Sequence, residues 1–233
     1  ITYKKEELKP YFTPLNPIIM ARKTLSQKLE SARLLIFNSK TPDVASLLTT
    51  MGVDTTYLKQ GEDLYNEVTR LMTSQKKEYQ EQSLAYDKFY LEKDDAEAAY
   101  ERTFKLARLL SRNDPDLQQR LDLKYIREYT LESWIDNALI FYDRLLNESE
   151  FLARLKRFKV TPHQLKAEQT AIKNLRQLRN EAIAEKGQAQ EATRLRNEKL
   201  EELDDYCREL KGIAEIALEE RPQLFEKLGV VVR

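Results

Sequence analysis

Glycine, proline, cysteine and histidine are all scarce in this chain, and each scarcity excludes a class of structure or site. Five glycines and seven prolines among 233 residues are too few for the turns of a β-sheet protein. The glycines also lie far apart, which excludes phosphate-binding loops of the P-loop or GxGxxG kind. A single cysteine excludes an intramolecular disulfide and favours a reducing compartment. We therefore expect a soluble, cytoplasmic protein, with a signal segment removed before Ile1 as the alternative.

The single histidine, His163, limits the catalytic sites that the chain can build. A ferritin-like di-iron site needs a Glu-x-x-His pair on each of two helices, and a zinc site needs three or four suitable ligands. His163 and Cys207 together supply neither set. We expect both residues to be structural, and the protein to be no enzyme and to need no cofactor or metal.

Charge of one sign and long apolar runs are missing as well. The formal net charge is +0, whereas nucleic-acid-binding proteins usually carry a basic excess. The longest apolar runs, at 34–37 and 138–142, are far shorter than a membrane span. Only a local patch of the surface could therefore bind a nucleic acid or a membrane.

What the chain does contain is typical of helices. Charged residues make up 33% and hydrophobic residues 41%, and the apolar residues recur at spacings of three and four. One such series runs through Leu203, Tyr206, Leu210, Ile213 and Ala217. This pattern predicts an all-α fold whose long helices pack along narrow apolar seams.

The sequence repeats itself at an interval of about 107 residues. The segment ARLLSRNDPDLQQRLDL (107–123) matches AEIALEERPQLFEKLGV (214–230), with Pro115 aligned to Pro222 and Leu121 to Leu228. A fixed period of this kind predicts a tandem duplication. We expect an N-terminal arm at 1–15, a helical bundle repeat at 16–121 and a second one at 122–233, each with a core of its own.

Cap and breaker residues give the expected helices of each copy. In the first copy these are 16–38, 42–51, a long helix starting after Asp54, and another ending near Leu110. We place a turn near 79–83 between the two long helices, because the second copy has Gly187 nearby. In the second copy the first helix spans 122–146 and a short one 148–158, and Thr161–Gln164 forms a capping box. Short helices after Pro115 and Pro222 close the copies, and the long helices should have roughly 23 to 30 residues.

The period and the helix count resemble the three-helix repeats of the spectrin family, and the first helix of the second copy carries a tryptophan, Trp134. The resemblance is one of architecture, and it implies a spacer or scaffold. A four-helix bundle is the alternative architecture.

The short helix of the second copy is basic, whereas its counterpart is not. Arg154, Lys156, Arg157 and Lys159 surround four apolar residues there, and the counterpart TPDVASLLTTM has no basic residue. A basic amphipathic helix can bind an anionic membrane, a nucleic acid or an acidic partner. The favoured interpretation is that its apolar side packs on the bundle while its cations reach water.

Four aromatic residues distinguish the first copy: Tyr79, Tyr86, Phe89 and Tyr90 align with Lys186, Thr193, Arg196 and Asn197. We expect them near a hairpin tip, as a contact surface or as the edge of an ordinary bundle.

These patterns predict a non-enzymatic scaffold or protein-interaction protein that acts through helix faces and hairpin tips. Its partner would be another protein or a second copy of itself. The alternatives are a membrane- or nucleic-acid-binding module that uses the basic helix 149–159, and an enzyme with an unrecognised site between the bundles.

Overall fold

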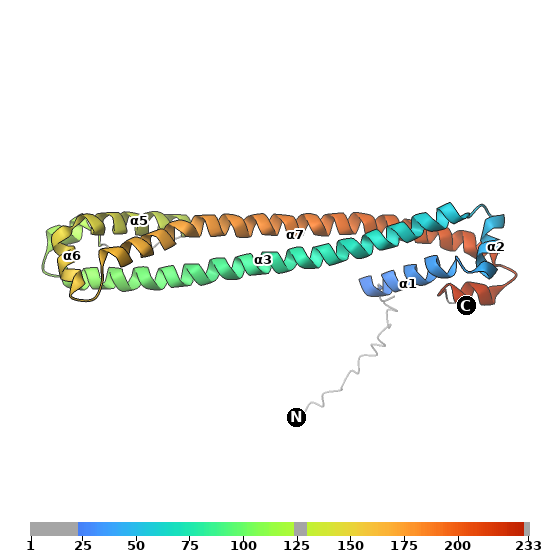
Figure 1. Ribbon diagram of the computed structural model, residues 1–233, viewed down its shortest axis with the longest axis horizontal. Coiled ribbons are helices and arrows are strands. Elements are labelled where there is room, and N and C mark those ends of the chain that lie inside the picture. The colour runs from blue at the N-terminus through green and yellow to red at the C-terminus, as the bar shows by residue number, and fades with distance from the viewer. Residues whose placement is uncertain (1–22, 124–129, 231–233) are drawn as a thin grey trace, which may run out of the picture. The chain divides into compact units, whose positions relative to one another are not determined.

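A computed structural model describes residues 23–123 and 130–230 (Figure 1). Within these ranges every regular element is a helix, which confirms the all-α prediction. The predicted arm, 1–15, lies outside the described residues. The helices are α1 (Leu25–Asn38), α2 (Pro42–Thr50), α3 (Thr55–Leu110), α4 (Pro115–Arg120), α5 (Leu131–Asn147), α6 (Ser149–Lys156), α7 (Pro162–Ala217) and α8 (Pro222–Lys227).

Several predicted helix starts are confirmed, because local side chains satisfy the free backbone N–H groups. Asp54 accepts a hydrogen bond from the Tyr57 N–H (2.8 Å), and Asp114 accepts one from the Leu117 N–H (2.9 Å). Thr161 accepts from the Gln164 N–H at 3.2 Å. The Gln164 side-chain amide nitrogen donates to Glu168 (2.9 Å), and among the described residues no hydrogen bond from the Thr161 N–H to the Gln164 side chain completes the predicted capping box.

The long helices differ from the prediction. α3 and α7 are unbroken and have 56 residues each, so the predicted turn near 79–83 and the lengths of roughly 23 to 30 residues are wrong. Gly187 lies inside α7, where an added Cβ would meet nothing within 4 Å. One exposed glycine costs a helix only about 1 kcal/mol and does not end it. The four aromatic residues therefore lie along a continuous helix and not at a hairpin tip.

The first helix of each predicted copy is shorter than expected. α1 starts at Leu25, after a capping box between Thr24 and Gln27, and α5 starts at Leu131. Lys23 is not helical, and Asp122 has a positive φ of 53°. The predicted start at 122 is therefore wrong, and the predicted start at 16 lies outside the described residues.

The chain forms two compact units that do not coincide with the predicted repeats. Of the described residues, the first unit contains 23–65 and 203–230, and the second contains the residues between 66 and 202. Each unit thus combines segments from both halves of the sequence. The starts of α3 and α7 are nevertheless 107 residues apart, as are those of α4 and α8.

In the first unit, α1 and α2 pack with the start of α3, the end of α7, and α8. The Asn38 side chain donates to the Lys227 carbonyl (2.7 Å), and Lys227 forms an ion pair with Asp43 (2.7 Å). Ile36, Leu48 and Leu210 are buried in this unit.

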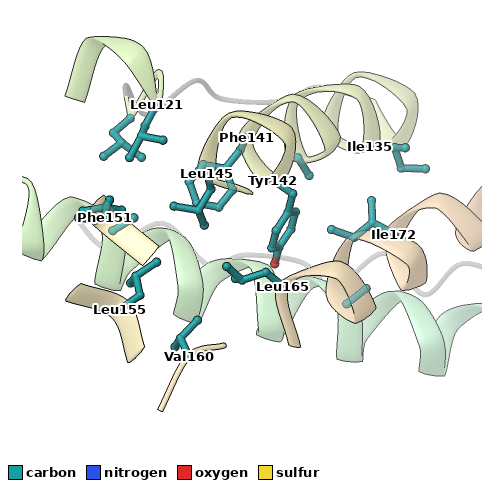
Figure 2. Close-up of a cluster of buried hydrophobic side chains, with 14 of the residues drawn as sticks. Leu121, Ile135, Phe141, Tyr142, Leu145, Phe151, Leu155, Val160, Leu165 and Ile172 are labelled. Carbon is teal, nitrogen blue, oxygen red and sulfur yellow. The ribbon is translucent and has the colours of Figure 1, made fainter. Parts of the chain in front are cut away.

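In the second unit, α5 runs beside the N-terminal part of α7, and α6 turns across the end (Figure 1). Figure 2 shows their buried side chains pointing into one cluster with Leu121 and Leu165. Ala107 and Leu117 also belong to it, so this core is built from both halves of the sequence.

Candidate functional site

The basic segment predicted from sequence lies on α6 and the turn that follows it. Phe151 and Leu155 are buried and fix α6 on the second unit, while Arg154, Lys156, Arg157 and Lys159 are all exposed. Arg154 is held in place, because its guanidinium donates to the Leu110 carbonyl and lies 5.4 Å from the centre of the Phe151 ring.

The turn after α6, residues 156–159, is here called the apex turn. Val160 N–H donates to the Leu155 carbonyl (3.3 Å) and closes the turn, while Lys159 has a positive φ of 64°. Phe158 is 52% exposed, although the residues on which the turn is anchored, Leu155 and Val160, are buried. The apex turn thus presents an aromatic ring among cations.

The four aromatic residues of α3 do not form one surface. Phe89 is only 6% exposed and belongs to the core. Tyr90 lies against the Phe89 ring (centroids 5.2 Å apart) and the Tyr86 ring (6.1 Å). Tyr79 is apart from these three, and its hydroxyl lies 3.3 Å from the Thr193 hydroxyl of α7.

The middle of α3 and α7 carries a groove that sequence analysis did not reveal. The N-terminus of α5 pairs with Arg176 and Arg179 of α7. On the C-terminal side of Arg179, α7 pairs with α3 alone, with no third helix among the described residues of the second unit. A groove of about 450 Å³ follows them there and is called the α3–α7 groove; it is lined by Leu71, Ser74, Glu78, Ala184, Gly187, Gln188, Glu191, Ala192 and Leu195.

Large apolar side chains are exposed along the same stretch. Leu84 of α3 is 67% exposed and Ile183 of α7 is 51% exposed, and Leu195 on the groove wall is exposed as well. Single exposed apolar residues are ordinary, and of these three only Leu195 lines the groove.

Three carboxylates near the groove come close enough to share a metal ion. Oxygens of Glu78, Glu81 and Glu185 all lie within 4.8 Å of one another, the one such group among the described residues. Glu81 also pairs with Lys77 at 3.3 Å. Exposed acidic groups often come this close without a metal, and we assign no metal to them.

A partly buried polar network lies in the second unit, and the sequence did not predict it. The Glu168 carboxylate accepts from the Tyr142 hydroxyl (2.9 Å), the Thr103 hydroxyl (3.0 Å) and the Gln164 amide (2.9 Å). Burial, and the carboxylate beside it, raise the pKa of Tyr142. Because its donors and acceptors are satisfied, the network has a structural explanation.

His163 belongs to the second unit and Cys207 to the first. His163 is exposed on the wall of a groove of about 650 Å³, together with Lys88 and Lys166. Cys207 is half-buried in the first unit, where burial and the nearby Asp204 raise the pKa of its thiol to about 12.

We predict that the Cys207 thiol reacts slowly with disulfide reagents in the folded protein. Because the thiolate is the reactive form, a pKa of about 12 leaves almost none of it at neutral pH. The rate should be lower by about a hundredfold or more than that of the unfolded chain. Reaction with an aromatic disulfide, followed by absorbance with and without denaturant, measures this; equal rates would contradict a protected thiol.

Along the part of the chain that the structure describes, no helix combines the length and the apolar character needed to cross a membrane. Comparison with known proteins finds no matching family model, no matching curated protein and no matching solved structure.

Proposed function

We propose that this protein is a non-enzymatic helical interaction protein, and that the α3–α7 groove is its binding surface. The observation that carries the proposal is the groove itself, whose lining includes the exposed side chain of Leu195. Its floor and walls include Ser74, Ala184, Gly187 and Ala192, whose small side chains let another helix approach closely.

The groove suits a helix better than a small molecule. It is lined by residues of two antiparallel helices, α3 and α7, and α5 packs on α7 further along in the same unit. A partner helix that places apolar residues every three or four positions could pack in the groove as α5 packs further along, and it would bury the Leu195 side chain. The partner is therefore a protein, and a second copy of this chain is the simplest one to test.

The proposal predicts that Gly187→Trp weakens association. An indole at this exposed helical position would occupy the groove, and no described side chain lies within 4 Å of the added Cβ. Self-association is measured by sedimentation equilibrium, and we expect the dimer dissociation constant to rise by about tenfold or more.

Gly212→Trp is the matched control. Gly212 lies in the same helix, is exposed, and also has open space around its Cβ position, but it is not part of the groove. Association that is equal in the two variants and the unmodified chain would contradict the groove as the binding surface.

We also propose that the chain is a tandem duplication with repeats at 16–121 and 122–233. Support comes from α3 and α7, which have 56 residues each, and from the order of a helix, a short helix, a long helix and a closing helix in each half. In this proposal the two compact units are equivalent assemblies, each made of elements from both repeats.

A further inference from the structure

The apex turn carries a lysine where glycine is the expected residue. Lys159 has a φ of 64°, in the left-handed region that side chains other than that of glycine disfavour. In the corresponding turn after α2, the residue at this position is Gly52, with a φ of 83°. A glycine would close the apex turn at a lower conformational cost, so the lysine is there at the expense of local stability.

The same turn directs an aromatic ring into solvent. Phe158 precedes Lys159 and is 52% exposed, although Leu155 and Val160 on either side are buried. These two buried residues anchor the turn on the second unit. Its counterpart in the turn after α2 is Met51, which has uncharged neighbours in Thr50 and Gly52.

The cations of the apex turn are available to a ligand. Lys156, Arg157 and Lys159 are exposed, and none forms an ion pair with a carboxylate in the described ranges. Arg154 differs, because the Leu110 carbonyl and the Phe151 ring already engage it. Three cations therefore surround one exposed ring within four residues.

We propose that the apex turn docks on the surface of an anionic lipid bilayer. The Phe158 ring enters the boundary between headgroups and acyl chains, and Lys156, Arg157 and Lys159 bind the lipid phosphates around it. Opposite charge identifies the ligand as anionic, and a single ring on a convex turn fits a flat, deformable surface. A nucleic acid would require cations along a groove and stacking surfaces for successive bases, and the turn has neither. The proposal concerns a surface other than the α3–α7 groove and does not depend on it.

Co-sedimentation of the full chain with vesicles tests the proposal. The vesicles are phosphatidylcholine alone or phosphatidylcholine with about a third of phosphatidylserine. The chain should bind the anionic vesicles, bind less as salt is added, and stay in solution with the neutral ones. Replacing Lys156 and Arg157 by glutamine should lower the partition coefficient by about fivefold for each cation, and Phe158→Ser by about tenfold.

Lys159→Gly separates binding from folding. Glycine relieves the positive φ, so this variant should melt at a higher temperature than the unmodified chain and yet bind the anionic vesicles about fivefold more weakly. The control is the pair Lys173→Gln and Lys211→Gln, which removes as much charge as the double glutamine variant from exposed sites on α7.

Three results would overturn the proposal. The first is that the unmodified chain fails to bind the anionic vesicles. The second is that the control pair weakens binding as much as the changes at Lys156 and Arg157, which would indicate unspecific attraction by net charge. The third is that the apex-turn variants lose affinity for a short DNA duplex or single strand while vesicle binding is unchanged.

Discussion

Gly61→Ala is expected to destabilise the protein, although alanine is the better helix former. A Cβ at this position in α3 would lie 2.3 Å from Cε1 of Tyr206, far inside van der Waals contact. The Tyr206 ring cannot easily retreat, because it stacks on Tyr57 with centroids 4.9 Å apart and its hydroxyl donates to the Tyr57 carbonyl (2.9 Å). Such overpacking typically costs about 1–3 kcal/mol, which exceeds the gain in helix propensity of about 1 kcal/mol.

Denaturant unfolding followed by circular dichroism measures the change, with Gly187→Ala as the control. Gly187 is also inside a 56-residue helix, but it is exposed and has no neighbour within 4 Å of its Cβ position. Alanine there should stabilise the protein by about 0.5–1 kcal/mol. Stabilisation by both substitutions would contradict the close packing of Tyr206 on Gly61.

The short helices could be predicted because their limits are local. Proline at the first position of α2, α4 and α8, and the cap at Asp114, determine where the chain begins each short helix within a few residues. The length of α3 and α7 could not be found in this way. The turn predicted near 79–83 rested on Gly187 of the second copy, but a single glycine does not end a helix, and no proline or adjacent pair of glycines lies in the interior of either helix.

Which segments pack together in one core could not be predicted from the sequence either. A period of 107 residues indicates which segments are equivalent, but it does not indicate whether a segment packs within its own half or with the other. The core of the second unit combines Ala107 and Leu117 with residues of α5 and α6. A fragment that ends at residue 121 therefore lacks much of this core.

The candidate surfaces were predictable to different degrees. The exposure of the cations at 154–159 follows from the amphipathic pattern of α6, and the structure agrees with that expectation. The positive φ of Lys159 could have been found by noting that it aligns with Gly52 in the repeat. The α3–α7 groove depends on where α5 begins beside α7, and no local pattern contains that information.

Gly61 and Glu168 show how equivalent positions acquire different surroundings. Each is the seventh residue of its long helix. In the first unit the missing side chain makes room for the Tyr206 ring, whereas in the second unit a carboxylate fills the position and binds the Tyr142 hydroxyl. The contrast between glycine and glutamate was visible in the sequence, but the tyrosines that accompany them lie 26 residues or more away.

Glu168→Leu is expected to destabilise the protein strongly, because it leaves a buried hydroxyl without an acceptor. Tyr142 is 0% exposed, and its hydroxyl donates to Glu168 Oε2. Thr103 is also buried, but its hydroxyl can turn to a carbonyl of its own helix. Loss of hydrogen bonds to a charged acceptor, together with the unsatisfied group, should reduce the free energy of unfolding by about 2–4 kcal/mol.

The double variant Glu168→Leu/Tyr142→Phe shows whether the hydroxyl is the cause. Removing both partners eliminates the unsatisfied group, so the double variant should be more stable than Glu168→Leu alone by about 1–3 kcal/mol. Tyr142→Phe alone should cost less than Glu168→Leu, because Thr103 and Gln164 still donate to the carboxylate. Additive losses in the double variant would mean that the two side chains are not coupled, and the polar network would then not be a determinant of this core.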